Sequence, residues 1–334
     1  MSGKFYKNNQ IDMKIAFFGT GEFSKNILDG ILKYNEIEVS LVVSQPDKPI
    51  GRKKVITPTP VKICAEHYNI PVLQPEKLRN NEAFFETLRN RELDFIVVVA
   101  YGKIVPNEVL EAPRHACINI HGSILPAYRG ASPIQESIKN GDIETGLTIM
   151  YMSEGMDEGD ILKIEKVQID ILDKTQNIFD KFEKIGAPLL INTLEGILDG
   201  SIKGEKQNDS KATYCSKIIK EDGEIDFNDS AKSIYDTYRA YNTWPGIFSS
   251  YKGKKILIEE CILEEHEFTH DETFQIGAVV EIEKNEKTNI GILCNPGILI
   301  LKKIKLEGKK SMDINSFING NKEFLDYKFE TCST

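Results

Sequence analysis

An asparagine and a histidine stand two residues apart in the segment 117–123, CINIHGS. Side chains two apart on a β-strand point to the same side, so Asn119 and His121 are predicted to project together. Gly122 allows the chain to turn directly after them. An amide donates to a developing oxyanion, and an imidazole donates to it or moves a proton, which suits acyl transfer. A lone histidine is more often structural, but the asparagine beside it favours a functional site.

A second candidate is the acidic, glycine-flanked loop GMDEGD at residues 155–160. Its Asp157 is expected to orient the imidazole of His121 and sustain its charged form. A solvated turn is the alternative interpretation. The ligand spacing of a calcium-binding loop is absent, so calcium is not predicted here. No serine or cysteine nucleophile is paired with the histidine, which favours direct attack by a substrate over a covalent enzyme intermediate.

A third segment, GTGEFS at residues 19–24, begins like a dinucleotide fingerprint. Ser24 stands where the third glycine or an alanine belongs, so a tight strand-to-helix turn is favoured over the site of an NAD-dependent dehydrogenase. The six cysteines form no pair with metal-ligand spacing, and buried reduced thiols are expected. Neither a metal nor a nicotinamide cofactor is predicted.

These residues need a scaffold, and residues 14–150 alternate short apolar runs with amphipathic stretches. Such runs are typical of strands buried on both faces and joined by crossover helices, which predicts a doubly wound, mostly parallel α/β sheet. Two further strands are expected on either side of the acidic loop. A long helix should follow them and end near Gly200. Ligands bind at the carboxyl ends of strands in such sheets, which is where Asn119 and His121 are placed.

The chain turns polar at residues 201–212, which we interpret as a connection between domains. A first domain is therefore expected at 13–200, after an N-terminal extension at 1–12, and a second at 213–334. Two domains also suit the length of 334 residues. In the second, a helix is predicted over 229–241, and the short strands after it favour a small β-barrel or sandwich.

The balance of acidic and basic residues bears on whether the protein coats nucleic acids. With 51 acidic and 42 basic side chains, the net charge is -9, which disfavours a general nucleic-acid coat. The first residues lack the apolar core of a secretion signal, and the longest apolar run, Phe95 to Tyr101, is too short to span a bilayer. We therefore expect a cytoplasmic protein with no membrane partner.

Two local groups of basic residues are candidates for contact with an RNA backbone. The first lies in a loop punctuated by proline and glycine and comprises Lys48, Arg52, Lys53 and Lys54. The second lies on the last predicted strand and comprises Lys302, Lys303 and Lys305. A solvated face is the alternative for each. In a chain of negative net charge, such concentrations offer the route to phosphate contacts, whose strength depends on salt.

Four segments together resemble the methionyl-tRNA formyltransferase family of folate-dependent formyltransferases. They are SQPDKPIGRKK (44–54), AYGKIVP (100–106), INIHGSILPAYRGASPIQ (118–135) and TGLTIMYMSEGMDEGD (145–160). The histidine segment and the Gly-Met-Asp loop point to folate-dependent formyltransferases in general. The early basic loop and the second domain point to the tRNA enzymes among them.

The resemblance implies a Rossmann-like catalytic domain and an OB-like carboxyl-terminal barrel that binds tRNA. The implied reaction transfers a formyl group from 10-formyltetrahydrofolate to the α-amine of methionyl initiator tRNA, without metal or nicotinamide. The implied catalytic residues are Asn119, His121 and Asp157. The implied folate-binding segment is Ser123, Ile124, Leu125 and Pro126. Ala127-Tyr128 replaces a bulkier basic-aromatic pair of the family, so altered local contacts but unchanged chemistry are expected, in a protein expected to be a monomer.

Two other functions stay open at this point. The nearer one is a folate-dependent formyltransferase that acts on a sugar-nucleotide or purine-precursor amine, which the basic loop and the second domain argue against. The other is a non-enzymatic RNA-binding protein that reuses the fold, which would not require Asn119, His121 and Asp157 together.

Overall fold

The computed structural model of the chain describes residues 13–51, 53–264, 275–284 and 287–330. The chain divides into two compact units. The first unit runs from the N-terminal side through residue 133 and also includes 144–168 and 179–216. The second includes 134–143, 169–178 and the chain from 217 onward. The first unit thus extends to residue 216, beyond the expected end of the first domain at residue 200. Two segments that precede residue 200, 134–143 and 169–178, belong to the second unit.

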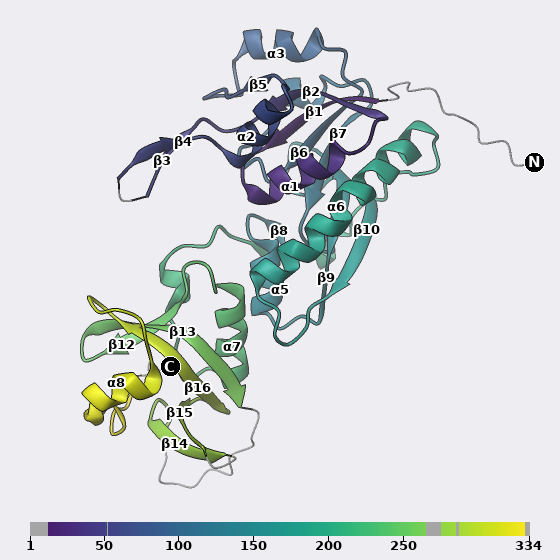
Figure 1. Cartoon of the computed structure of the whole chain (residues 1–334). Coiled ribbons are helices and arrows are strands. Elements are labelled where there is room, and N and C mark those ends of the chain that lie inside the picture. Colours follow the sequence, from purple (N-terminus) through teal and green to yellow (C-terminus); the bar gives the residue numbers. More distant parts are fainter. Residues whose placement is uncertain (1–12, 52, 265–274, 285–286, 331–334) are drawn as a thin grey trace, which may run out of the picture. The chain divides into compact units, whose positions relative to one another are not determined.

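A seven-stranded mixed sheet organises the first unit, in the order β10-β9-β7-β6-β1-β2-β5 (Figure 1). Its strands are β1 (Met13–Gly19), β2 (Ile37–Val43), β5 (Val72–Leu73), β6 (Phe95–Val99), β7 (Ala116–His121), β9 (Glu144–Tyr151) and β10 (Ile161–Gln168). The pairs within β7-β6-β1-β2-β5 are parallel, whereas β9 and β10 are antiparallel to their neighbours. The expected Rossmann-like, mostly parallel α/β sheet is confirmed in this mixed form.

The apolar runs of the sequence form the centre of this sheet. All five residues of β6 are buried, as are the last five residues of β2 and most of β1. Burial on both faces explains why these strands read as continuous apolar stretches instead of alternating ones. The helices of the chain up to residue 198 are α1 (Glu22–Ile31), α2 (Pro60–His67), α3 (Glu82–Arg89), α4 (Asn107–Leu110), α5 (Pro133–Lys139) and α6 (Thr175–Leu198).

The GTGEFS segment forms the turn from β1 into α1. Ser24 is fully buried, and its hydroxyl donates to the carbonyl of Val99 at 2.6 Å. A Cβ on Gly19 would lie 2.7 Å from the Cβ of Ser24, so only glycine permits this close approach. The serine that breaks the dinucleotide fingerprint therefore ties α1 to the end of β6.

The second unit contains a six-stranded antiparallel sheet in the order β12-β13-β16-β15-β14, with β17 paired to β16. Its strands are β12 (Ile247–Tyr251), β13 (Lys254–Glu264), β14 (Val279–Lys284), β15 (Lys287–Leu293), β16 (Ile298–Leu306) and β17 (Met312–Asp313). Helices α7 (Ala231–Ala240) and α8 (Ile314–Gly320) contribute buried residues to its core. Within the described residues β12 and β14 do not pair with each other, so the expected closed OB-like barrel is not confirmed. The amino-acid sequence indicates where the strands lie, but it does not show whether the first and last strands of the sheet pair with each other.

Short pairs of strands complete the fold. The pair β3 (Lys48–Ile50) and β4 (Val55–Thr57) forms a hairpin, and β8 (Arg129–Gly130) pairs in parallel with β11 (Tyr214–Cys215). The 3-10 turns are η1 (Asp209–Lys211), η2 (Glu221–Gly223) and η3 (Lys322–Phe324). No helix in the described part of the chain combines the length and the apolar composition needed to cross a bilayer.

Candidate active site

Strand β7 brings the asparagine and the histidine to one place, at its carboxyl end. The neighbours Ile118 and Ile120 are buried in the sheet. Asn119 donates from Nδ2 to Oδ1 of Asp157 at 3.4 Å. Nδ1 of His121 lies 3.5 Å from Oδ2 of the same carboxylate. The predicted same-side projection of the pair thus leads both side chains to Asp157.

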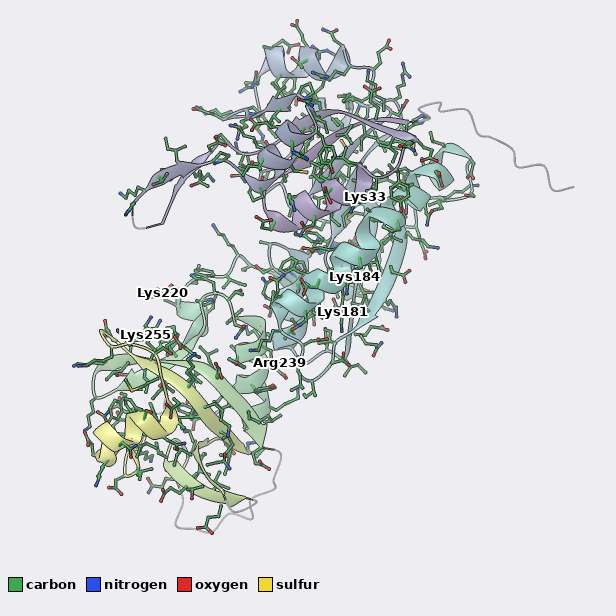
Figure 2. The ribbon with its side chains drawn as sticks, in the orientation of Figure 1. Lys33, Lys181, Lys184, Lys220, Arg239 and Lys255 are labelled. Atoms are coloured by element: carbon green, nitrogen blue, oxygen red, sulfur yellow. The ribbon has the colours of Figure 1, made fainter. Side chains whose placement is uncertain are left out.

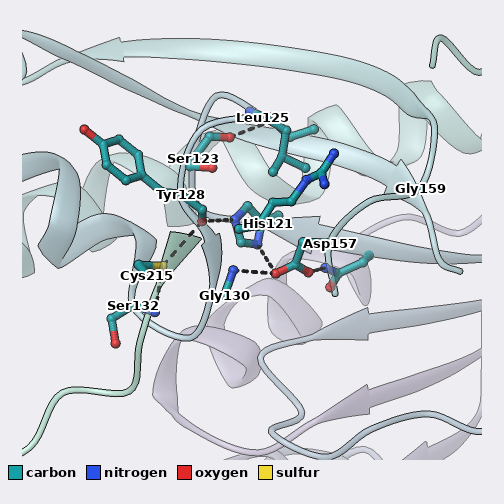
Figure 3. A network of polar contacts seen from close by, with 12 residues as sticks. His121, Ser123, Leu125, Tyr128, Gly130, Ser132, Asp157, Gly159 and Cys215 are labelled. Carbon is teal, nitrogen blue, oxygen red and sulfur yellow. Dashed lines mark hydrogen bonds and ion pairs between the residues drawn. The ribbon is translucent and has the colours of Figure 1, made fainter. Parts of the chain in front are cut away.

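Asp157 lies in the loop between β9 and β10, and its carboxylate has a third partner. The backbone N–H of Gly130 donates to Oδ2 at 2.8 Å (Figure 3). The backbone of Asp157 has φ +51°, in the left-handed region that costs a residue with a side chain ~1–2 kcal/mol. A Cβ on Gly159 would lie only 1.8 Å from the carbonyl oxygen of Tyr151, so this position must be glycine. The loop is therefore a shaped turn and not a freely solvated one.

The imidazole of His121 has its tautomer set by a backbone carbonyl. Nε2 lies 2.9 Å from the carbonyl oxygen of Tyr128 (Figure 3). A carbonyl only accepts, so Nε2 carries a proton, and in the neutral ring Nδ1 has the free lone pair. Burial lowers the pKa of His121, although the Asp157 carboxylate and the Tyr128 carbonyl act in the opposite direction. The sequence led us to expect a charged imidazole sustained by Asp157, whereas burial of a ring only 5% exposed outweighs the carboxylate.

The segment Ser123–Pro126, predicted to bind folate, is a tight turn after β7. Its Ser123 hydroxyl donates to the carbonyl of Ala127 at 2.6 Å. The hydroxyl of Thr148 on β9 donates to the Ser123 carbonyl at 2.6 Å and accepts from the Leu125 N–H at 3.2 Å. Ser123 and Leu125 are buried, while Ile124 and Pro126 are partly exposed. Ser123 and Leu125 therefore shape the turn, whereas Ile124 and Pro126 offer apolar surface.

Sequence reasoning missed the groups that support these residues from residues 207–215. The first residues of this segment belong to the predicted connection between the domains, 201–212, and the last ones follow it. The Thr213 hydroxyl accepts from the Tyr128 N–H at 2.8 Å, and its carbonyl accepts from the Arg129 N–H at 2.8 Å. The thiol of Cys215 donates to the Tyr128 carbonyl at 3.4 Å. These contacts join positions about 85 residues apart, and no local pattern in the letters marks them.

The basic loop is the β3–β4 hairpin. Lys48 lies on β3 and donates from Nζ to Oε1 of Gln45 at 2.8 Å, while the Nε2 group of Gln45 donates to the carbonyl of Tyr101 at 2.8 Å. The root of the hairpin thereby adjoins the chain that leaves β6. Lys53 and Lys54 are exposed in the turn. Arg52 lies outside the described residues.

The second basic group lies on β16, in the second unit. Lys302 donates to Oδ1 of Asn289 at 2.7 Å, Lys303 lies 3.6 Å from Oε1 of Glu260, and Lys305 is exposed. Sequence reasoning assigned nothing to Lys255, which Figure 2 labels together with Lys220 in the same unit. Burial and then repulsion by Lys220 lower the pKa of Lys255, while Glu224, Glu221 and Glu307 act in the opposite direction.

The described residues hold no group of three or more histidine, cysteine, aspartate or glutamate side chains arranged to bind a metal ion. The cysteines in this part of the chain are buried and form no disulfide with one another, and they are Cys64, Cys117, Cys215, Cys261 and Cys294. Burial raises the pKa of the thiols of Cys117 and Cys261, and that of Cys294 to about 12. Such thiols are poor nucleophiles, which favours chemistry centred on Asn119, His121 and Asp157.

Comparison with known protein families matches both parts of the chain. Residues 13–194 match the formyl transferase family, and residues 217–322 match the formyl transferase C-terminal domain. A methionyl-tRNA formyltransferase of Caldicellulosiruptor saccharolyticus is 44% identical over 310 residues, which cover 93% of this chain and 97% of that protein. One of Lachnospira eligens is 42% identical, over 92% of this chain and 97% of that protein.

Solved structures share the fold at lower identity. WlaRD, a sugar 3N-formyl transferase crystallised with dTDP and 5-N-formyl-THF, is 21% identical with a TM-score of 0.61, and the match covers 90% of this chain and 99% of that one. HypX from Aquifex aeolicus, in complex with tetrahydrofolic acid, is 17% identical with a TM-score of 0.59, over 94% of this chain and 48% of that one.

Proposed function

The chain belongs to the formyl transferase family, and we propose that it transfers the formyl group of 10-formyltetrahydrofolate to the α-amine of methionyl initiator tRNA. The observation that carries this function is the match, over both parts of the chain, to relatives named methionyl-tRNA formyltransferase at 42–44% identity. The sugar formyl transferase of similar fold is only 21% identical. Formyl transfer to a sugar-nucleotide or purine-precursor amine is accordingly the weaker alternative.

The site residues fit direct attack of the amine on the formyl carbon. We propose that Nδ2 of Asn119 donates to the formyl oxygen as it becomes an oxyanion. Nδ1 of His121, with its free lone pair, accepts the proton that the attacking amine loses. Asp157, whose Oδ2 lies 3.5 Å from Nδ1, stabilises the resulting imidazolium, which keeps its proton and donates a hydrogen bond to the oxyanion.

Collapse of the tetrahedral intermediate breaks the bond between the formyl carbon and N10 of the folate. The proton held by His121 passes to N10 through ordered water near Asp157, so the new amide and tetrahydrofolate leave with atoms and charges balanced. The neutral imidazole favoured by burial is the form that this sequence of steps requires. Neither a metal nor a nicotinamide takes part.

We assign the folate to the turn Ser123–Pro126. Ile124 and Pro126 supply apolar contacts, and the buried Ser123 and Leu125 hold the turn in shape. The tRNA is assigned to the β3–β4 hairpin with Lys48, Arg52, Lys53 and Lys54, and to Lys302, Lys303 and Lys305 of β16. We also propose that the protein is a cytoplasmic monomer. Its carboxyl-terminal sheet is proposed to be OB-like and to bind RNA.

The test is a formyl-transfer assay with purified protein, 10-formyltetrahydrofolate and charged initiator methionyl-tRNA. Uncharged tRNA, free methionine and an amino-sugar nucleotide serve as competing acceptors, and one arm contains EDTA. Transfer to the charged tRNA alone, unaffected by EDTA, is the expected result. Faster transfer to the amino-sugar nucleotide would replace the tRNA function with the alternative, and loss of activity in EDTA would refute the metal-free mechanism.

A further inference from the structure

Gln207 contacts the loop that carries Asp157 from a segment 50 residues further along the chain. Its Nε2 group donates to the carbonyl oxygens of Asp157 and Gly159, each at 2.8 Å. Its Oε1 accepts from Nε and Nη2 of Arg129 at 3.1 and 2.9 Å. A carbonyl only accepts and a guanidinium only donates, so these partners determine which way the amide faces. Gln207 therefore links the loop to Arg129 with both ends of its amide.

The loop needs such support because of its backbone. Asp157 has φ +51°, and a residue with a side chain keeps this conformation only when its surroundings hold it. The two hydrogen bonds from Gln207 reach the carbonyls on either side of residue 158, at the centre of the turn. They thereby hold the backbone from which the Asp157 carboxylate projects.

Arg129 is a firm anchor for Gln207. Its side chain is only 2% exposed, and Nη2 also donates to Oδ1 of Asp209 at 2.7 Å. The next residue, Gly130, donates its N–H to the Asp157 carboxylate at 2.8 Å. One dipeptide thus holds Asp157 twice: Gly130 contacts the carboxylate directly, and Arg129 acts on the backbone through Gln207.

We propose that Gln207 is a positioning residue for formyl transfer, which places the Asp157 carboxylate against Asn119 and His121 without touching either substrate. This role rests on the proposed function. The carboxylate meets Asn119 at 3.4 Å and His121 at 3.5 Å, so a small displacement removes one contact or both. A misplacement of ~1 Å in a catalytic group costs ~10²-fold in rate, and loss of an outer partner costs ~10–100-fold in the metal sites where it has been measured.

Two variants separate the parts of this linkage. Gln207→Leu removes all of the hydrogen bonds, whereas Gln207→Glu keeps acceptors for Arg129 and loses the two donors to the loop. We expect both to lower kcat by ~10–100-fold while KM for the folate changes far less, because Gln207 acts on the catalytic group and not on binding. The matched control is Gln168→Leu on β10, an exposed glutamine that donates to Glu144 at 3.3 Å and should keep normal kcat.

A second readout is independent of the reaction. The groups facing His121 are the Asp157 carboxylate, which raises the pKa of His121 against burial, and the Tyr128 carbonyl. A displaced carboxylate should therefore shift the titration of His121 to lower pH in Gln207→Leu, as followed by NMR of ¹⁵N-labelled histidine. The shift tests positioning even if the wild-type protein formylates another acceptor.

Normal kcat in Gln207→Glu would overturn the positioning role, because the donors to the loop would then be dispensable. A lowered melting temperature in Gln207→Leu with an unchanged His121 titration would also overturn it, since Gln207 would then stabilise the fold alone. Failure of the wild-type protein to formylate methionyl-tRNA would instead count against the proposed function.

Discussion

At the residue scale, the proposed site consists of two side chains and one backbone N–H that meet at one carboxylate. Asn119 and His121 reach Asp157 from β7, and Gly130 holds the carboxylate from the other side. In the proposed mechanism the two strand residues act mainly in the transition state, where the oxyanion and the transferred proton appear. Their removal should therefore affect turnover more than binding.

We expect Asn119→Ala and His121→Ala each to lower kcat at least ~10²-fold with a modest change in KM for the folate, the scale found for lost oxyanion donors elsewhere. Steady-state kinetics with both substrates varied will measure the change in kcat and the change in KM separately. His115→Ala, at an exposed histidine beside β7, is the control and should keep normal turnover. A variant that retains more than about a tenth of kcat would remove its residue from the proposed role.

The buried imidazole also predicts how stability depends on pH. Burial lowers the pKa of His121 below its ordinary value of 6.5, so below that pH the unfolded chain binds a proton that the folded chain does not. The free energy of unfolding contributed by this group should fall as pH drops from 6.5 towards the folded-state pKa, and stay level below it. Urea denaturation on both sides of this ordinary pKa should show a smaller loss for His121→Gln than for the wild type. Equal losses would mean that His121 is charged in the folded protein.

At the element scale, neighbouring strands and hairpins shape the proposed substrate sites. Thr148 on β9 bonds to both the Ser123 carbonyl and the Leu125 N–H, and so holds the turn Ser123–Pro126, the proposed folate site, from the adjacent strand. The β3–β4 hairpin is joined at its root to the chain after β6 through Gln45. Each of these elements therefore offers a test that leaves Asn119, His121 and Asp157 intact.

Thr148→Val keeps the side-chain shape and removes the hydroxyl that holds the folate turn. It leaves two buried backbone groups without this partner, at a cost of ~1–3 kcal/mol each. We expect KM for the folate to rise and the melting temperature to fall, measured by kinetics and thermal unfolding. Thr193→Val is the matched control, because that buried hydroxyl bonds to the carbonyl of Leu189 within α6, at 2.7 Å. An unchanged folate KM in Thr148→Val would argue against folate binding at this turn.

Removal of positive charge from the hairpin should affect tRNA and not folate. We expect Arg52→Ala, and the double change Lys53→Ala with Lys54→Ala, to raise KM for methionyl-tRNA far more than KM for the folate. The reason is that, in the proposed function, cations of this hairpin contact phosphates of the acceptor end, and Lys53 and Lys54 are exposed in its turn. Lys163→Ala, at an exposed lysine on β10, is the control. Equal effects on both substrates would contradict a role of the hairpin in tRNA binding.

At the scale of the whole molecule, the proposed function requires an acidic chain to bind an acidic RNA. The net charge of -9 gives no general attraction, so phosphate contacts must come from local groups of lysine and arginine. The sheet of the second unit carries one such group on β16. Its contribution should therefore be visible in the salt dependence of binding.

We expect the change of Lys302, Lys303 and Lys305 to glutamine to weaken tRNA binding broadly and to flatten its dependence on salt, by ~1 in the slope for each phosphate that is no longer neutralised. Binding of charged tRNA titrated against salt will measure it. The same three positions changed to arginine keep the charge and form the control. An unchanged slope in the glutamine variant would eliminate β16 as a platform for tRNA.

The sequence by itself determined the class of the fold and the residues at the centre of the site. Apolar runs such as FIVVV at 95–99 predict buried parallel strands, and the period of two places Asn119 and His121 on one side of β7, because both signals are local. The residues also marked Asp157 as a candidate but left its loop between a solvated turn and a site, and the family resemblance favoured the site.

Only the tertiary structure decided what surrounds these residues. The protonation of His121 depends on burial by distant chain, and the support of Asp157 comes from Gln207, across 50 residues that no periodicity connects. The sequence could not show, for the same reason, that β12 and β14 do not pair with each other, since strand pairing is a non-local contact. Local patterns report which groups are present, whereas burial, pairing and hydrogen bonding depend on which distant groups the fold brings beside them.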